Sequence, residues 1–151
     1  MRRFYASPEQ FQGDTVVLDP EETRHLVRVL RLGVGARVEV CDGGGGNFEA
    51  VVTDLASREA RLELVRRLEP WGESPLALIL GLGLAKGDVL DEVIRQATEM
   101  GVREIVPFVS ERSEKADPGR SGRRLQRWQR LAQESLKSCQ RCVLPRPRGV
   151  M

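Results

Sequence analysis

The second half of the chain carries an apolar segment, a glycine-rich turn, a helical pattern and another apolar segment, in that order. Residues 76–82 are apolar throughout, as expected of a strand buried on both faces. Residues 88–100 have helical periodicity, and Gly101 is predicted to end the helix. The apolar face of this helix is predicted to comprise Leu90, Val93, Ile94, Ala97 and Met100. Residues 105–109 form the second predicted strand, which makes this half a parallel α/β unit.

A second helix is predicted over residues 120–138. Its inward positions are predicted to be Leu125, Trp128, Ala132 and Leu136, and its outward positions Arg123, Arg127 and Arg130. Pro107 lacks the N–H that a sheet ladder uses, so the strand over residues 105–109 is predicted to lie at an edge or to be irregular.

The first half, residues 1–70, is predicted to be a small β domain with one helix. Strand patterns occur at residues 16–18, 37–41, 48–55 and 61–68, and the glycine run after Asp42 reads as a hairpin tip. Short strands joined by glycine turns favour a small barrel or sandwich. Prolines and a glycine near residues 71–75 predict a linker, which leaves residues 76–151 as the second domain.

The helix of the first half is predicted to begin after Asp19, which can cap it, with Pro20 in the first position and Glu22 completing a capping box. Its apolar face is predicted to comprise Leu26, Val29 and Leu30. Its basic stripe is predicted to comprise Arg24, Arg28 and Arg31.

The histidine of the chain, His25, is flanked by this basic stripe, and a basic–aromatic run with Arg2 and Arg3 opens the chain. Arginine and histidine contact phosphates and stack on bases in RNA recognition, so these residues are candidate RNA contacts. The alternative interpretation is an ordinary solvated helix face.

Basic side chains collect at one end of the chain. The net charge is only +2, yet residues 112–151 contain eleven basic and three acidic residues, and residues 32–111 contain eight and fourteen. This segregation indicates an anionic partner, of which nucleic acid is the commonest. No apolar run approaches about 20 residues and no secretory signal is recognisable, so the prediction is a cytoplasmic protein with no membrane span.

The cysteines do not predict a metal site. Cys139 and Cys142 form one CxxC, but a structural zinc site needs four ligands, and the other candidates, Cys41 and His25, are distant in sequence. A redox pair is expected at the start of a helix, whereas this pair follows one. We therefore expect chance spacing and no bound metal, with Cys139 packed on a helix face.

Polar side chains follow both predicted strands of the second half. Lys86 and Asp88 come after the first strand, and Glu111-Arg112-Ser113 after the next. Open α/β sheets place ligands at the carboxyl ends of strands, so these residues predict a polar cleft, with solvated loops as the alternative. Gly81, Gly83 and Gly87 also suggest a dinucleotide turn, although their spacing is one residue too long for that fingerprint.

Taken together, the ordered motifs resemble one family. They are Arg2-Arg3-Phe4, His25 to Arg31, the Asp42-Gly43 hairpin, Lys86-Gly87-Asp88, Ala97 to Gly101, Ile105-Val106-Pro107, Glu111-Arg112-Ser113, Arg127-Trp128 and Glu134. The series is similar to the bacterial 16S ribosomal RNA methyltransferases that modify ring nitrogen N3 of a uridine in the small subunit. The chain departs from the family at Ser138-Cys-Gln-Arg141, where the family has Gln-Ser/Cys-Gly-Arg.

The resemblance implies a PUA-like RNA-binding β-barrel over residues 1–70, followed by the N-terminal half of a SPOUT-class methyltransferase domain. It implies 16S rRNA as partner, S-adenosylmethionine as methyl donor, and a homodimer for the complete protein. The trefoil knot and the donor site are expected beyond residue 151, so this piece is expected to be inactive alone and to expose apolar surface where further strands would pair.

The resemblance also implies roles for individual residues. RNA contacts are expected from Arg2, Arg3, His25, Arg28 and Arg31. The methyltransferase cleft is expected to include Lys86, Asp88, Glu99, Glu111, Arg112 and Ser113. Among these, Arg112 or Lys86 is the expected cation that favours the deprotonated uracil. The alternatives are a stand-alone RNA-binding adaptor and, third, a dinucleotide-binding enzyme.

Overall fold

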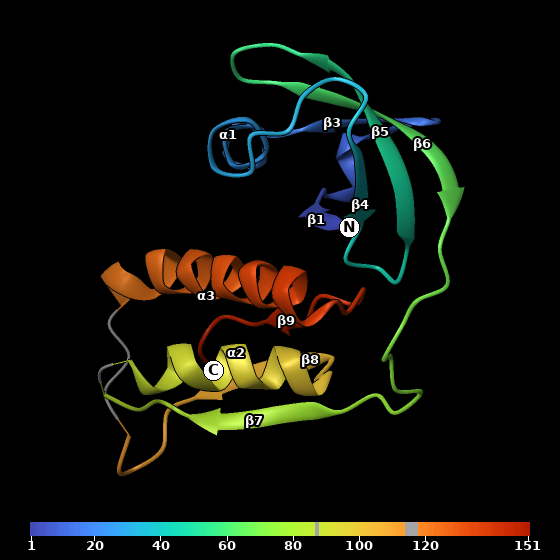
Figure 1. The fold of residues 1–151 in the computed structure, drawn as a ribbon. Helices are drawn as coiled ribbons and strands as arrows, with labels where there is room; N and C mark the ends of the chain where they lie inside the picture. The colour runs from blue at the N-terminus through green and yellow to red at the C-terminus, as the bar shows by residue number, and fades with distance from the viewer. Residues whose placement is uncertain (87, 114–117) are drawn as a thin grey trace. The chain divides into compact units, whose positions relative to one another are not determined.

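The computed structural model describes residues 1–86, 88–113 and 118–151, with the backbone alone for residues 118–120. The described chain forms two compact units, Met1–Trp71 and Gly72–Met151, here called the first and second unit (Figure 1). Gly87, the third glycine of the suggested dinucleotide turn, lies outside the described residues. In the part of the chain that is described, no helix is both long and apolar enough to cross a membrane.

The first unit is built on a six-stranded sheet in the order β1-β4-β5-β6-β3-β2. Its strands are β1 (Arg2–Tyr5), β2 (Phe11–Gln12), β3 (Thr15–Leu18), β4 (Arg37–Cys41), β5 (Asn47–Leu55) and β6 (Ala60–Arg67). Neighbouring strands are antiparallel except β1 and β4, which are parallel. The four strands predicted in this half are confirmed within two residues at each end.

The β4–β5 hairpin confirms the predicted glycine turn. Asp42 Oδ1 accepts hydrogen bonds from the N–H groups of Gly44 and Gly46, at 2.7 and 2.8 Å. A side-chain carboxylate thus replaces backbone acceptors inside the turn, which is why aspartate opens it. Alternate residues of the strands form the core of the first unit, which includes Phe4, Leu18, Val40 and Leu62.

Helix α1 (Pro20–Arg24) begins as predicted, because Asp19 Oδ1 accepts from the N–H groups of Glu21 and Glu22, both at 2.8 Å. The helix then widens into a π-helical segment, η2 (His25–Val29), where Leu30 N–H donates to His25 O. This i→i+5 pattern breaks the 3.6-residue period on which the predicted apolar face rested. Leu26 is buried as predicted, but Val29 is 64% exposed, so its predicted place on the apolar face is wrong.

The second unit contains a parallel three-stranded sheet in the order β7-β8-β9, with two helices packed against one face (Figure 1). Its elements are β7 (Ile79–Gly83), α2 (Val89–Met100), β8 (Glu104–Phe108), α3 (Pro118–Cys139) and β9 (Arg146–Pro147). The predicted strand–helix–strand–helix order is therefore confirmed. The core of this unit joins α2 and α3 to the sheet and includes Leu90, Ile94, Ile105, Trp128 and Ala132.

Burial of β7 on both faces was predicted, and the structure shows burial on one face only. Leu80 packs against the core, but Ile79 is 62% exposed and Leu78, just before the strand, is 45% exposed. β7 is an end strand of this sheet, and among the described residues both helices cover the same face. Apolar side chains are therefore exposed along one face of β7.

Three further details concern α2 and β8. Pro107 was predicted at an edge or an irregular position. β8 is the central strand, so the edge position is wrong, but the ladder between β8 and β9 ends at Ile105, before Pro107. Beyond that ladder the Pro107 carbonyl accepts from Met151 N–H at 2.9 Å. Gly101 ends α2 with φ of 81°, as predicted. Met100, predicted on the apolar face, is 76% exposed because it lies in the last turn, past the core.

Candidate functional site

The helical segment η2 carries two of the predicted RNA-facing residues, His25 and Arg28, and Arg31 follows just after it. Arg28 and Arg31 are exposed, and Arg31 adopts a positive φ of 53°, where the chain leaves the helix. His25 is half-buried and meets the ring of Phe4 edge to face, with centroids 6.1 Å apart. Contact with the core thus fixes the histidine at the base of the segment while the two guanidiniums extend into solvent.

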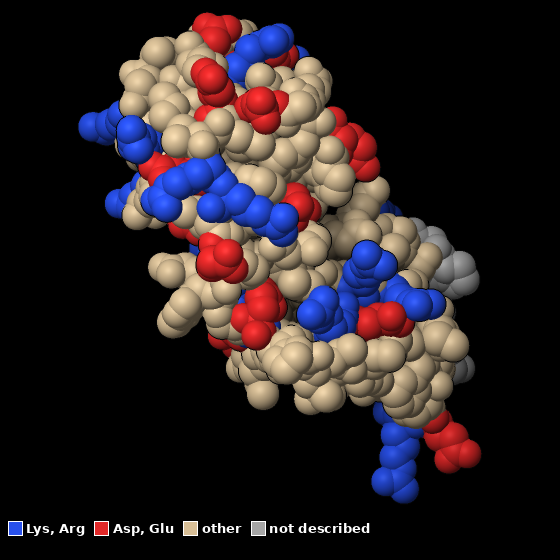
Figure 2. All heavy atoms as spheres, turned by 90° about the vertical axis from the view of Figure 1, so that its right-hand side faces the viewer, with Lys and Arg blue, Asp and Glu red and all other residues tan. Residues whose placement is uncertain are grey.

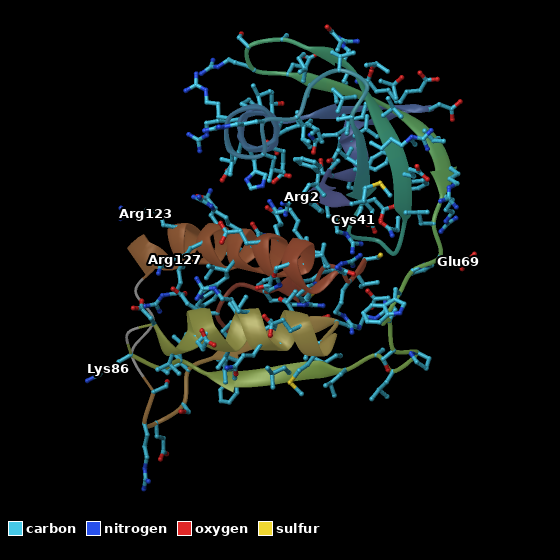
Figure 3. The ribbon with its side chains drawn as sticks, viewed as in Figure 1. Arg2, Cys41, Glu69, Lys86, Arg123 and Arg127 are labelled. Atoms are coloured by element: carbon cyan, nitrogen blue, oxygen red, sulfur yellow. The ribbon has the colours of Figure 1, made fainter. Side chains whose placement is uncertain are left out.

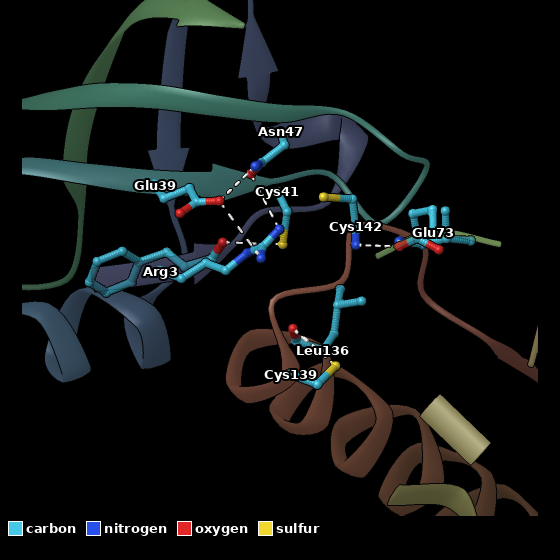
Figure 4. A network of polar contacts seen from close by, with 10 residues as sticks. Arg3, Glu39, Cys41, Asn47, Glu73, Leu136, Cys139 and Cys142 are labelled. Atoms are coloured by element: carbon cyan, nitrogen blue, oxygen red, sulfur yellow. Dashed lines mark hydrogen bonds and ion pairs between the residues drawn. The ribbon is translucent and has the colours of Figure 1, made fainter. Parts of the chain in front are cut away.

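The paired arginines of β1 point in opposite directions, because side chains alternate along a strand. Arg2 is exposed (Figure 3). The side chain of Arg3 is only 6% exposed; it lies 3.7 Å from Glu39 and donates to Asn47 Oδ1 at 3.3 Å (Figure 4). Asn47 in turn donates to Glu39 at 2.6 Å. Arg3 is therefore part of the internal structure of the first unit, a correction to its predicted RNA-facing role.

A second charged cluster lies across β4, β5 and β6. Glu49, whose side chain is 5% exposed, accepts from Arg37 at 2.8 Å and from Arg66 at 2.7 Å. These two guanidiniums, Arg37 first, lower the pKa of Glu49 below its ordinary value. The cluster ties three strands together, and sequence analysis gave no sign of it because its members are 12 and 17 residues apart.

The carboxyl ends of β7 and β8 meet at one edge of the parallel sheet, because Gly83 pairs with Phe108. Lys86 is exposed just beyond β7 (Figure 3). Beyond β8, Ser113 Oγ accepts from Ser110 N–H at 2.7 Å and donates to Ser110 O at 3.0 Å, which closes a turn. Glu111 and Arg112 are exposed at the tip of that turn.

Two other predicted cleft residues lie elsewhere or act differently. Glu99 is exposed near the C-terminal end of α2, about 16 Å along the helix axis from Asp88, so it does not share this edge. Asp88 occupies the N-cap position of α2, but its side chain makes no capping hydrogen bond. It lies instead 3.6 Å from Arg127 of α3. Asp88 therefore does not cap α2 through its side chain.

A groove that sequence analysis missed lies beside the start of α2. Its volume is about 490 Å³, and it is lined by Ala85, Asp88, Leu90, Asp91, Arg123, Arg124, Arg127 and Trp128. Arg127 Nε donates to the carboxylate of Asp91 at 2.7 Å, across 36 positions of sequence. The spacing of Arg123 and Arg127 on one helix face was the available signal, but nothing in the sequence identified the carboxylate opposite them.

Glu73 forms a clasp that joins the two ends of the second unit. Its carboxylate accepts from the N–H groups of Cys142 and Val143 at 2.6 and 3.0 Å, and from Arg141 at 2.7 Å (Figure 4). Arg141 also donates to Gly72 O at 2.6 Å. Cys142 is thus engaged through its backbone, and within the described ranges no group of three potential metal ligands occurs.

Two protein families match the chain. Residues 72–151 match the RNA methyltransferase domain family, and residues 18–65 match the RNA methyltransferase PUA domain family. The Ribosomal RNA small subunit methyltransferase E of Synechocystis is 36% identical over 95% of this chain and 46% of its own length. The protein of the same name from Bacillus subtilis is 26% identical over 89% of this chain and 53% of its own length. The chain thus spans about half the length of these curated relatives.

Solved structures resemble both units. The Ribosomal RNA small subunit methyltransferase E of Neisseria gonorrhoeae, solved bound to S-adenosyl methionine, matches with a TM-score of 0.88 and 31% identity. A methyltransferase of Legionella pneumophila, in complex with the cofactor, matches with a TM-score of 0.87 and 26% identity. Each match covers 99% of this chain and 62% of the solved chain.

Proposed function

The chain belongs to the RNA methyltransferase family, and on that basis we propose that the complete protein methylates ring nitrogen N3 of a uridine in 16S ribosomal RNA of the small subunit. The observation that carries the proposal is the order of the two family matches, with a PUA match before a methyltransferase match on one chain. The relatives named for small-subunit RNA methylation support the choice of substrate.

The first unit is the proposed RNA-binding domain. Arg2, Arg28 and Arg31 are exposed and can reach phosphates, and half-buried His25 lies on the same segment as Arg28. Arg3 is left out of this set because Glu39 and Asn47 hold it inside the unit. The PUA family match over residues 18–65 supports this assignment.

The edge at the ends of β7 and β8 is the proposed place for the target base. The N3–H proton of uracil must leave before N3 can accept a methyl group, and a nearby cation stabilises the resulting anion. Lys86 and Arg112 are exposed cations beyond the two strand ends, so either can supply that charge. Asp88, Glu111 and Ser113 are proposed to shape the same edge.

S-adenosylmethionine is the proposed methyl donor, supported by the two relatives solved with it. When bound, it supplies a methyl group on a sulfonium cation. The described groove is a poor fit, because its three guanidiniums outnumber its two carboxylates and repel a sulfonium. We therefore assign no residue of this chain to the donor.

Finer features of the complete protein also rest on the resemblance. We propose domains at residues 1–70 and 76–151 with a linker at 71–75, a knotted SPOUT fold, a homodimer, and action in the cytoplasm. The 62% coverage of the solved relatives leaves room in the complete protein for the knotted part.

The test uses the complete protein, small ribosomal subunits and S-adenosylmethionine carrying a labelled methyl group. We expect label in 16S RNA, and strongly reduced label with Arg112→Ala at unchanged helical content. Arg95→Ala, which removes an exposed-face arginine of α2, serves as the control and should leave transfer unchanged. RNA binding without any label would favour the adaptor alternative and contradict the proposed reaction.

A further inference from the structure

Three arginines of the second unit line the groove beside α2 and α3. Its volume of about 490 Å³ is far more than a single phosphate group needs. Its floor is partly apolar, since Leu90 and Trp128 are buried at 3% and 2% exposure. The space suits a nucleotide segment with one charged group held at the rim.

Three guanidiniums enter the groove from one face of α3. Arg127 is four residues after Arg123 and three after Arg124, so it is a neighbour of both on the surface of the helix. Two carboxylates, those of Asp88 and Asp91, also line the groove, so its described residues carry a formal charge of +1. The groove therefore attracts anions even after its own acidic groups are counted.

Asp91 orients Arg127 and still leaves it able to bind an anion. The side chain of Asp91 is 10% exposed, and its carboxylate accepts a hydrogen bond from Arg127 Nε at 2.7 Å. The contacts of Arg127 with the two aspartates use Nε and Nη2. Because a guanidinium has five N–H donors, the Nη1 side stays available, and the Arg127 side chain is still 62% exposed.

We propose that this groove binds a backbone phosphate of the substrate RNA, which gives the methyltransferase domain an RNA contact of its own. The inference rests on the proposed function for the identity of the ligand. Guanidinium pairs suit phosphate because their N–H groups match two phosphate oxygens at once. The groove lies just after β7, since Ala85 lines it, so a strand of RNA held there passes the edge where the base is proposed to bind.

The test measures binding of a labelled single-stranded RNA by the 151-residue chain. The groove variant is Arg123→Gln/Arg124→Gln. The matched control, Arg95→Gln/Arg130→Gln, removes the same amount of charge from α2 and α3 outside the groove, where these arginines pair with Glu92 and Glu134. We expect the groove variant to bind about tenfold more weakly and to lower the salt slope by about 0.7 per lost phosphate contact. The control should stay within about twofold of the wild type.

A third variant is expected to strengthen RNA binding instead of weakening it. Asp88→Asn removes an exposed carboxylate 3.6 Å from Arg127 and should tighten RNA binding by about two- to threefold. Equal weakening by the groove variant and the control would overturn the proposal, because the effect would then be net charge alone. Weakening by Asp88→Asn would overturn it as well.

Two comparisons separate this inference from the proposed function. If Arg28→Gln weakens RNA binding while the groove variant binds as the wild type does, the groove proposal fails and the RNA-binding domain stands. Inorganic pyrophosphate, followed by Trp128 fluorescence in a Trp71→Phe background, separates free phosphate from RNA. Tighter binding of pyrophosphate than of RNA would contradict an RNA site.

Discussion

Replacing Glu73 by alanine tests whether the clasp at the ends of the second unit stabilises it. The substitution leaves the N–H groups of Cys142 and Val143 and the guanidinium of Arg141 without their acceptor. Glu73 and Arg141 are 15% and 11% exposed, so water replaces the lost contacts only in part. Three hydrogen bonds to a charged group, discounted for this exposure, give a loss of about 3 kcal/mol in the free energy of unfolding.

The loss is large for a unit of this size. For the 80 residues from Gly72 to Met151, 1 kcal/mol shifts the unfolding temperature by about 4–8 °C, so Glu73→Ala should lower it by about 12 °C or more. Glu73→Gln keeps an oxygen for the backbone N–H groups and should lose only about 1 kcal/mol. The matched control is Glu134→Ala, whose partner Arg130 is 3.3 Å away and exposed, with an expected loss of about 0.5 kcal/mol or less.

Trp128 reports on this unfolding. It is 2% exposed, whereas Trp71 is 73% exposed, so a Trp71→Phe background isolates the fluorescence of the second unit. Heating each variant in that background gives the midpoints to compare. If Glu73→Ala and Glu134→Ala had the same midpoint temperature of unfolding, the contacts of Glu73 would not stabilise the second unit, and this reasoning would be refuted.

Three other predictions follow from the structure. Gly101→Ala should destabilise the second unit by about 1 kcal/mol or more, measured by urea unfolding, because φ is 81° and the added Cβ would overlap the Arg141 guanidinium. The pKa of Glu49 is lowered in the folded protein, so the stabilisation by its carboxylate is complete above the ordinary glutamate pKa of about 4.3. That stabilisation is lost as the pH falls through the lower pKa of the folded state. The difference in free energy of unfolding between the wild type and Glu49→Gln should therefore disappear in that acid range. Arg28→Gln should weaken RNA binding and flatten its salt dependence, measured by fluorescence anisotropy; binding equal to that of the wild type would exclude η2 as a contact.

The sequence correctly predicted those elements that are set by contacts between residues close together in the chain. Asp19 caps α1 through the next two N–H groups, and Asp42 closes the glycine hairpin within four residues. The order of apolar and helical segments after residue 76 likewise predicted the parallel unit. These features depend on neighbours in sequence, so the pattern contains the necessary information.

The predictions that were wrong concern residues whose position depends on contacts with residues far away in the sequence. Arg3 turns inward because parallel pairing of β1 and β4 sets it opposite Glu39, a register that the sequence does not reveal. Val29 is exposed because a π turn shifts the period of the helix. The groove depends on Asp91 and Arg127, which meet only after α2 and α3 pack, so an exposed arginine stripe was all that could be predicted.

The most direct test of the central claim is the chemical identity of the methylated nucleoside. Small ribosomal subunits are incubated with the complete protein and S-adenosylmethionine, and the 16S RNA is hydrolysed to nucleosides for mass spectrometry. The account predicts N3-methyluridine at a single position, and a loss of that product when Arg112 is replaced by alanine. A methyl group on another base, on a ribose, or on large-subunit RNA would contradict it.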